Sequence, residues 1–351
     1  MEVITGWSHR AFAMGDATCV GEARRHCAQA IADWGWPDED AGRLSLVVTE
    51  LGTNLLRHAV QGQLWIAFKP AWREVEVIAL DKGPGMVDVQ RSLTDGVSTG
   101  SGSPGTGLGA VRRMASDFDV HSSPQGTLVL ARVRPEGVAQ PALGVRLGAV
   151  RLAAPGETVC GDGWALALEG VPAGEGSLTA RPRHDRLTLL VSDGLGHGPE
   201  AAAASDAALA RFAQDPFAPL PALLQALDRG LGGTRGAALF LLRADPGEPL
   251  RFTGAGNILG RVMSGVYDKG MLTPHGTAGV QLRRAEPSTQ ELPAHAMMLV
   301  HTDGIASRWP ASALAPLMPR DPALLAAALV WNQLRGRDDA TVVVLKQEEP
   351  S

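Results

Sequence analysis

The run Val47-Val-Thr-Glu-Leu-Gly-Thr-Asn-Leu-Leu-Arg-His-Ala59 decides the fold of the first half of this 351-residue chain. Its apolar residues recur at the three- and four-residue spacing of a helix that buries one face. Glu50 and Asn54 are four residues apart, so they lie on the same side of that helix. A carboxylate beside an amide can ligate Mg²⁺ and orient a nucleophile, because Mg²⁺ prefers oxygen ligands. The run therefore predicts a helix that carries part of a magnesium site.

The segments on either side predict an α+β domain. Helical periodicity extends over residues 15–60, and a stretch rich in Gly, Ser and Thr occupies residues 92–109. The order helices, strands, loop, helix, strands is typical of a sandwich with helices on one face of a sheet. Besides the helical region, the predicted elements are strands over Gln63–Lys69 and Glu74–Leu80, a helix over 108–116, and strands near 118–121 and 127–133.

Two glycine-rich motifs follow the predicted helix and suit a nucleotide. Asp81 comes directly after an apolar strand, where its carboxylate could accept a hydrogen bond from an adenine amino group. Gly83 and Gly85 would let the backbone approach the base. Free N–H groups at a helix start bind phosphate, and three glycines lead into the next helix. These are Gly105, Gly107 and Gly109.

Each of these motifs alone has an ordinary structural explanation, as a polar helix face, a turn or a flexible loop. Together, VVTELGTNLLRHA, ALDKGPGM and GSPGTGLGAVRRMA make residues 10–134 resemble the Bergerat-fold (GHKL) ATPases. The domain is most similar to anti-sigma-factor serine kinases of the RsbW and RsbT type. The resemblance implies that Glu50 is the general base, Asn54 the Mg²⁺ ligand and Asp81 the adenine contact. It also implies that the five glycines named above surround the nucleotide, with Gly105, Gly107 and Gly109 closing over the phosphates.

The second half of the chain predicts sheets covered by helices. Residues 135–142, PEGVAQPA, have two prolines and little periodicity, which indicates a linker. We therefore expect domains over 1–134 and 143–351. The predicted strands are 145–152, 187–192, 237–242, 297–301 and 341–346, and the predicted helices are 200–213, 220–231 and 322–334.

Four aspartates in this half stand at strand ends or turns, next to glycine or another polar residue. They are Asp162, Asp193, Asp303 and Asp338. An Asp-Gly pair at a strand end projects a carboxylate and frees the next carbonyl, and such oxygens can hold two hard divalent ions. A pair of ions lowers the pKa of a shared water and holds phosphate oxygens. One Asp-Gly pair alone would be interpreted as a turn, but four such sites predict a metal centre.

These motifs, VCGDGW, LLVSDGLGHG, TGAGN, VHTDGI and GRDDATVVVL, make residues 143–347 resemble PPM-type (protein phosphatase 2C-like) serine/threonine phosphatases of the SpoIIE and RsbX branch. The resemblance implies an α-β-β-α sandwich. It implies that Asp193 bridges two metals, that the Gly194 carbonyl helps and that Asp162 lies beside one metal. Asp303 and Asp338 would hold the other. The chain departs from many eukaryotic members because Glu157 stands near the place of their phosphate-binding arginine.

Composition limits the classes of partner. The formal net charge of −5 predicts no broad basic surface for nucleic acid, and no apolar run approaches the roughly 20 residues that span a bilayer. Three cysteines without a CxxC pair indicate a reducing compartment. The N-terminal residues lack the pattern of a signal peptide. We therefore expect a cytoplasmic protein that binds neither nucleic acid nor membrane.

The sequence as a whole predicts a bifunctional regulator that uses ATP, Mg²⁺ and Mn²⁺. By resemblance, its first domain phosphorylates a serine and its second removes phosphate from phosphoserine or phosphothreonine. The partner implied is a STAS-domain anti-anti-sigma protein, with a sigma factor or an upstream regulator as a further partner. Two alternatives stay open for the first domain: a non-catalytic ATP sensor, or a module that binds a partner protein.

Overall fold

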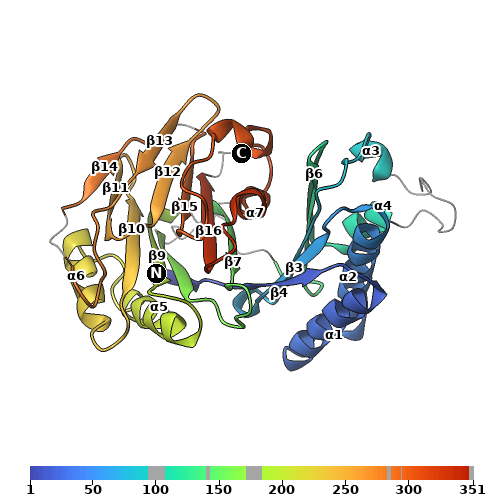
Figure 1. Ribbon diagram of the computed structural model, residues 1–351, viewed down its shortest axis with the longest axis horizontal. Helices are drawn as coiled ribbons and strands as arrows, with labels where there is room; N and C mark the ends of the chain where they lie inside the picture. The colour runs from blue at the N-terminus through green and yellow to red at the C-terminus, as the bar shows by residue number, and fades with distance from the viewer. Residues whose placement is uncertain (94–106, 140–142, 171–183, 283–285, 294, 348–351) are drawn as a thin grey trace, which may run out of the picture. The chain divides into compact units, whose positions relative to one another are not determined.

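The computed structural model describes residues 1–93, 107–139, 143–170, 184–282, 286–293 and 295–347. The chain folds into two compact units (Figure 1). The first unit is His9–Pro141. The second unit combines Met1–Ser8 with Ala142–Ser351.

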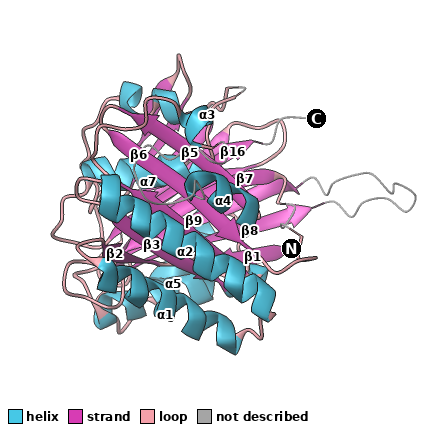
Figure 2. Ribbon diagram, turned by 90° about the vertical axis from the view of Figure 1, so that its right-hand side faces the viewer, coloured by secondary structure: helices cyan, strands magenta, loops and turns pink. Residues whose placement is uncertain are grey.

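The first unit is an antiparallel sheet with helices on one face. Its strand order is β2-β3-β4-β6-β5, and Figure 2 shows α1, α2 and α4 in front of it. The strands are β2 (His9–Ala13), β3 (Gln63–Lys69), β4 (Glu74–Leu80), β5 (Asp117–Ser123) and β6 (Gly126–Val133), and the helices are α1 (Ala17–Asp33), α2 (Asp38–His58), α3 (Val89–Ser92) and α4 (Gly107–Met114).

Local sequence explains both long helices of this unit. Asp16 caps α1 by accepting a hydrogen bond from the N–H of Thr18 at 2.7 Å. Helix α2 has three acidic residues in its first turn and Arg57 and His58 in its last, which suits the helix dipole. The apolar stripes of both helices pack on the sheet face that carries Val75 and Val77. This side of the sheet holds the core of the unit.

The other face of the same sheet carries a buried ionic network, because side chains alternate along each strand. Glu76 accepts hydrogen bonds from Lys69 Nζ at 2.8 Å and from Arg132 Nε at 2.6 Å. His9 Nε2 lies 3.2 Å from a Glu76 oxygen, and Lys69 also donates to Glu74 at 2.8 Å. All five side chains are buried. Each charge is therefore compensated by a direct partner within this unit.

The second unit consists of two sheets with helices on their outer faces. The sheets have the orders β1-β8-β9-β10-β11-β14 and β13-β12-β15-β16-β7. Helices α5 and α6 pack on the first sheet, and α7 packs on β7 and β16 of the second. The strands are β1 (Glu2–Thr5), β7 (Val145–Leu152), β8 (Asp162–Gly170), β9 (His184–Gly194), β10 (Ala237–Ala244), β11 (Leu250–Ala255), β12 (Leu259–Met263), β13 (Asp268–Met271), β14 (Ser288–Gln290), β15 (Met297–His301) and β16 (Ala340–Gln347), and the helices are α5 (Pro199–Phe212), α6 (Leu220–Gly230) and α7 (Pro322–Gln333).

The layer order of this unit is helix, sheet, sheet, helix. A Cβ placed at Gly260 of β12 would lie 2.6 Å from the Phe240 ring of β10, so the two sheets face each other there. A Cβ at Gly148 of β7 would lie 2.1 Å from the backbone of Ala323 in α7, so the helix is on the outer side. The predicted α+β class, with an α/β sandwich followed by an α-β-β-α sandwich, is confirmed.

The first eight residues belong to the second unit, whereas the sequence predicts a first domain over 1–134. Strand β1 pairs antiparallel with β8, from Glu2 opposite Leu168 to Thr5 opposite Ala165. The Trp7 ring then lies edge-on to Trp164, with 4.8 Å between the ring centroids. Four residues at the chain start are too short to predict as a strand, and only pairing with β8 makes them one. The first unit is thus inserted between β1 and β7.

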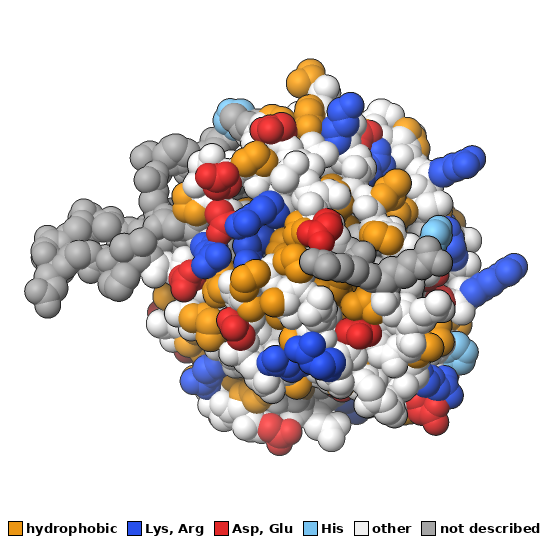
Figure 3. Space-filling view, turned by 90° about the vertical axis from the view of Figure 1, so that its left-hand side faces the viewer, with side chains coloured by type: hydrophobic (Ala, Val, Ile, Leu, Met, Phe, Trp, Pro, Cys, Tyr) orange, Lys and Arg blue, Asp and Glu red, His pale blue; other side chains and the backbone are white. Residues whose placement is uncertain are grey.

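The predicted elements of the first domain are confirmed with ends within two residues, and β3 and β4 match fully. Strands of three to six residues were missed in both units because they show little periodicity, and the nine-residue β8 was missed as well. No helix in the described part of the chain has the length and hydropathy needed to cross a membrane. On the surface drawn in Figure 3, basic, acidic and hydrophobic side chains are intermixed.

Candidate functional site

Asp81 follows directly after β4 and closes a tight turn. Its Oδ1 accepts a hydrogen bond from the N–H of Gly83 at 2.6 Å. The Asp81 N–H donates to the carbonyl of Thr127 at 3.0 Å. Partial burial raises the pKa of the Asp81 carboxyl, and the Gly83 N–H opposes that rise. The sheet therefore holds this carboxylate in one orientation at a strand end.

Glycines allow the Asp81 turn to pack against the β5–β6 hairpin. Gly85 has φ +74°, and a Cβ there would lie 2.1 Å from the carbonyl oxygen of Ser123. Gly126 in the hairpin has φ +141°, and a Cβ there would lie 2.0 Å from the Asp81 carbonyl oxygen. Gly83 is buried, and a Cβ there would lie 2.9 Å from Asp81 Oδ1. Within the protein, these glycines are required by the turn itself.

The Asp81 turn lies against the C-terminal end of α2. Lys82 N–H donates to the carbonyl of Val60 at 2.9 Å, just beyond the helix. Asn54 and Glu50 are one and two turns before His58, the last residue of α2, and both are partly buried. The structure thus brings the Asp81 turn to the end of the helix that carries Asn54.

The glycines predicted to hold phosphate are described only in part. Gly105 lies outside the described residues. Helix α4 begins at Gly107, with Gly109 buried in its first turn, and packs beside α2. Figure 1 shows the two helices on the same face of the sheet. The binding of phosphate by the N–H groups at the start of α4 stays a prediction.

In the second unit, two of the predicted aspartates are direct neighbours across paired strands. Asp162 begins β8 and Asp193 stands one residue before the end of β9, and the register places them opposite each other. Opposite residues in an antiparallel pair have Cβ atoms about 4.5–5.5 Å apart. A Cβ at Gly194 would lie 2.1 Å from the carbonyl oxygen of Ala201, so glycine lets α5 approach the end of β9.

The other two predicted aspartates come from the second sheet. Asp303 follows β15, and Asp338 lies two residues before β16, the neighbouring strand. A Cβ at Gly304 would lie 1.9 Å from the carbonyl oxygen of Asp339, so the two segments are in backbone contact. Thr302 Oγ1 donates to Asp162 Oδ2 at 2.8 Å. This bond links Asp162 of the first sheet to the residue that directly precedes Asp303.

The carboxylates interact strongly enough to change their protonation. The pKa of Asp193 is well above its ordinary value because burial removes water and Asp162, Asp303, Asp338 and Asp339 add negative charge. Burial raises the pKa of Asp162 to about 7, although the hydroxyl of Thr302 opposes the rise. Burial also raises the pKa of Asp303, with Asp338 adding to it. We call these five aspartates the carboxylate cluster.

The carboxylate cluster has the donor chemistry of a site for hard cations. Asp339 Oδ2 is buried without a hydrogen-bond partner, which leaves a carboxylate oxygen for a ligand. The donors are all oxygens, which Mg²⁺ and Mn²⁺ accept. In the described residues, no three His, Cys, Asp or Glu side chains form a group ready to hold a metal ion. The residue types and charges fit, and the carboxylates would have to converge further on an ion.

Three residues near the cluster were not predicted as site residues. Asn257 Nδ2 donates to Asp303 Oδ2 at 2.5 Å, and Thr302 Oγ1 binds Asp162. The Arg151 charge partly offsets the raised pKa of Asp162, and its buried Nε has no hydrogen-bond partner. Asn257 ends the TGAGN motif and could have been found there. Arg151 is eleven residues before Asp162 on another strand, so no local pattern marks it.

Glu157 and His197, both noted in the sequence, are paired with each other. His197 Nδ1 lies 2.7 Å from Glu157 Oε1 at the start of α5. His197 is exposed, whereas Glu157 is partly buried. Glu157 thus contacts the loop that follows Asp193.

The comparisons with known proteins concern both halves of the chain. Residues 15–133 match the model of the histidine kinase-like ATPase domain. The chain is 31% identical over 129 residues to the serine/threonine-protein kinase RsbT of Bacillus subtilis (strain 168). The match covers 34% of this chain and 96% of that protein. The crystal structure of RsbX in complex with magnesium matches with a TM-score of 0.48 and 17% identity, over 58% of this chain and 96% of that one.

A third comparison covers more of the chain. The structure of the PP2C phosphatase domain and part of the regulatory domain of SpoIIE from Bacillus subtilis matches with a TM-score of 0.44 and 15% identity. It covers 77% of this chain and 79% of that chain.

Proposed function

Because the chain belongs to the histidine kinase-like ATPase family through residues 15–133, we propose that its first unit binds Mg·ATP and phosphorylates a serine of a partner protein. The second unit removes phosphate from phosphoserine or phosphothreonine with Mn²⁺ or Mg²⁺. The observation that carries the second activity is the placement of Asp162 opposite Asp193, where burial raises the pKa of Asp193 and the charges of the other four carboxylates add to the rise. Such a concentration of negative charge is costly unless cations neutralise it.

In the kinase reaction, the protein mainly positions groups and neutralises charge. Asn54 would ligate Mg²⁺, and Asp81 would accept a hydrogen bond from the adenine amino group. Glu50 lies on the same side of α2 as Asn54 and would take the proton from the attacking serine hydroxyl. Gly107 would present the N-terminus of α4 to the phosphates.

In the phosphatase reaction, Asp193 would bridge two cations, with the Gly194 carbonyl and Asp162 beside one of them. Asp303 and Asp338 would hold the other. When bound, two such ions supply a nucleophilic water at neutral pH and stabilise the oxygens of the phosphate. Asn257 would keep the Asp303 carboxylate oriented through its hydrogen bond. Arg151 would balance negative charge beside Asp162.

The partner that suits both activities is a STAS-domain anti-anti-sigma protein, which is phosphorylated on serine in partner switching. A sigma factor or an upstream regulator is a further partner by the same resemblance. The similarity to a serine/threonine-protein kinase over almost its full length supports a protein substrate for the first unit.

Two alternatives are that the first unit is an ATP sensor without kinase activity, or that it binds the partner protein without transferring phosphate. The partly buried Asp81 turn against α2 supports nucleotide binding under either version. The kinase differs from both alternatives in that Glu50 acts as a base.

The decisive experiment uses Asp193→Asn, so that hydrolysis does not erase the phosphorylated product. We would incubate this variant with Mg·ATP and STAS-domain proteins of the same genome, and resolve the products on a phosphate-affinity gel. A shifted band that wild-type protein with Mn²⁺ reverses establishes both activities. ATP binding without a shifted band would rule out the kinase.

The matched control is the double variant Glu50→Ala, Asp193→Asn. If Glu50 is the base, this protein binds ATP with unchanged affinity but gives no shifted band. A general base typically contributes about 10²–10⁴-fold to the rate. An unchanged rate in the double variant would remove Glu50 from the mechanism.

A further inference from the structure

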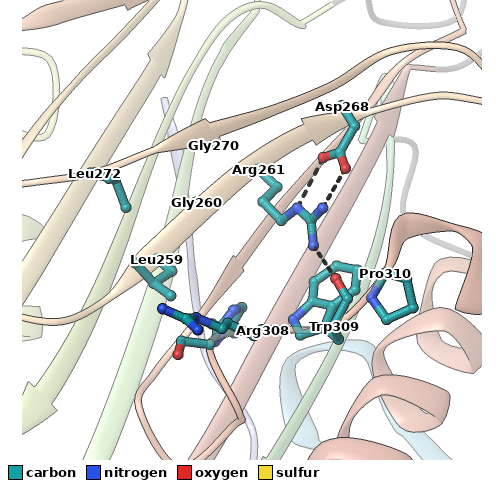
Figure 4. A pocket seen from close by; sticks show the side chains of 11 residues that line it. Leu259, Gly260, Arg261, Asp268, Gly270, Leu272, Arg308, Trp309 and Pro310 are labelled. Atoms are coloured by element: carbon teal, nitrogen blue, oxygen red, sulfur yellow. Dashed lines mark hydrogen bonds and ion pairs between the residues drawn. The ribbon is translucent and has the colours of Figure 1, made fainter.

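A pocket of about 620 Å³ lies on the outer face of the second sheet, and no residue of the carboxylate cluster lines it. Strands β12, β13 and β15 form its floor, and the segment 307–310 forms one wall. Figure 4 shows Arg308 between Leu259 and Trp309 at this wall. None of the roles assigned above uses the pocket.

One wall of the pocket is held rigidly by Arg261. Its guanidinium makes a two-point ion pair with Asp268, seen as two dashed lines in Figure 4. Arg261 Nη1 also donates to the Trp309 carbonyl at 3.1 Å, and the guanidinium lies 3.9 Å from the centroid of the Trp309 ring. The charge of Arg261 is therefore compensated, and the indole has a fixed position.

Two buried polar atoms among the lining residues have no hydrogen-bond partner. They are Nε2 of His301, which is 1% exposed, and Nε1 of Trp309, which is 6% exposed. His301 Nδ1 lies 2.9 Å from the Thr302 carbonyl, which can only accept, so Nδ1 carries the proton. Nε2 of the neutral ring is then an acceptor, whereas Trp309 Nε1 is a donor. Twelve buried side-chain atoms in the described residues lack a hydrogen-bond partner, and these are the two whose residues line this pocket, which makes them the candidate ligand contacts there.

An acceptor beside a donor matches a peptide amide, which offers one N–H and one carbonyl. The centroids of the His301 and Trp309 rings are 6.3 Å apart, so one short stretch of polypeptide could reach both. Arg308 is exposed at the pocket wall and adds a positive charge. The pocket therefore suits a peptide segment with an acidic side chain.

The pocket is close to the carboxylate cluster along two strands. Leu259 of β12 pairs with His301 of β15. Asn257, two residues before Leu259, and Asp303, two residues after His301, are hydrogen-bonded to each other. Two strand residues span about 7 Å. An extended polypeptide with its phosphate at the cluster would thus place a residue about two positions away at the pocket.

We propose that this pocket binds the substrate segment next to the phosphorylated residue, with a peptide amide on His301 and Trp309 and an acidic side chain on Arg308. The inference rests on the proposed phosphatase function and specifies its substrate. A substrate with an acidic residue near the phosphoserine would be preferred over a small phosphate ester.

The first test compares three substrates in the presence of Mn²⁺: p-nitrophenyl phosphate, a phosphoserine peptide with flanking Glu residues, and the same peptide with Lys in their place. We expect Arg308→Glu to lower the ratio of kcat/KM for the Glu peptide to that for p-nitrophenyl phosphate at least tenfold. It should raise the ratio for the Lys peptide. The control Arg229→Glu, an exposed arginine on α6, should leave both ratios unchanged.

The second variant, Trp309→Phe, keeps a ring under Arg261 and removes only the N–H donor. We expect KM for the Glu peptide to rise about five- to tenfold with little change in kcat, because the lost bond holds the flank and not the phosphate. An unchanged melting temperature would establish that the variant folds. A fall in kcat alone would overturn the assignment of Trp309.

Direct binding separates failure of the inference from failure of the proposed function. Fluorescence anisotropy of the labelled Glu peptide with Asp193→Asn protein, with and without Arg308→Glu, needs no turnover. If wild-type protein hydrolyses none of the three substrates but Arg308→Glu weakens binding of the Glu peptide, the peptide-binding pocket is supported and the phosphatase function is overturned. If hydrolysis occurs and Arg308→Glu affects the Glu and Lys peptides equally, the pocket proposal is overturned.

Discussion

The buried carboxylates of this protein have sharply different environments. Burial and neighbouring carboxylates raise the pKa of Asp193, and burial raises that of Asp162 to about 7. Glu76 is also fully buried, yet Lys69 and Arg132 hold its pKa well below the ordinary value despite the desolvation. A buried carboxylate thus faces other negative charges in the second unit, whereas positive charges compensate it in the first.

The raised pKa of Asp162 predicts a pH-dependent stability. Between about pH 4 and pH 7 the folded protein keeps a proton on Asp162 that the unfolded chain has lost. The stabilisation is complete below the unfolded pKa and is lost as pH rises through about 7. Without metal, Asp162→Asn should therefore melt higher than wild type at pH 8 and similarly at pH 4. Each kcal/mol corresponds to about 2–4 °C.

Adding Mn²⁺ should reverse this order at pH 8, because only the wild-type carboxylate can share the charge of a cation. The measurement is calorimetry of both proteins across pH, with and without Mn²⁺. Parallel pH profiles for the two proteins would contradict the assignment to Asp162.

Removing the charge of Glu76 should destabilise the protein, whereas removing that of Asp162 should stabilise it at pH 8. Glu76→Gln removes the charge that Lys69 and Arg132 both contact, and breaking a buried pair costs about 3–5 kcal/mol. The control is Glu22→Gln, which breaks an exposed pair with Arg10 and should cost about 0–1 kcal/mol. Urea unfolding measures both. Equal losses in the two variants would show that the buried network contributes no more than a surface pair.

At the scale of elements, glycine positions determine how closely the strands and helices of the cluster approach. Gly194 faces α5, and Gly304 faces the segment before β16. Neither needs a left-handed backbone, so both are required by space alone. The Asp-Gly pairs of the sequence therefore mark close packing beside each aspartate.

The close contact at Gly304 predicts a selective loss of hydrolysis. Gly304→Ala would place a Cβ 1.9 Å from the Asp339 carbonyl oxygen and push the Asp303 and Asp338 segments apart. Overpacking of this kind costs about 1–3 kcal/mol. We expect phosphatase activity to fall at least tenfold while ATP binding persists. Gly265→Ala, where no atom lies within 4 Å of the added Cβ, should retain full activity. Full activity in Gly304→Ala would contradict this account.

At the scale of the whole molecule, the chain order predicts that the first eight residues matter for the second unit. Removing residues 1–8 deletes β1 and Trp7, which leaves the edge of β8 unpaired and Trp164 without its edge-on partner. We expect the deletion to lower the stability of the second unit and its phosphatase activity, but to spare ATP binding. Differential scanning calorimetry and nucleotide titration measure the two effects. A deletion that weakens only ATP binding would assign residues 1–8 to the first unit.

Much of this arrangement could be predicted from local patterns. The stripe around Val47 predicted α2, because 21 residues with a clear helical period leave little choice, and the apolar run over residues 187–192 predicted β9. The four predicted aspartates all belong to the carboxylate cluster. Strand β1 was not predicted, because a run of four residues has no period of its own and becomes a strand only by pairing with β8.

The sequence by itself determined the two classes of sandwich, the order of the elements and the residue types that could hold ATP and metal ions. It did so because periodicity, turns and short motifs are local properties of the chain. Only the tertiary structure decided that Asp162 lies opposite Asp193, that Thr302 and Asn257 contact the cluster, and that His301 and Trp309 line one pocket. The Asn257 and Thr302 contacts join residues 46 and 140 positions apart, and the Asp162–Asp193 pair depends on strand register, which packing sets and no local pattern records.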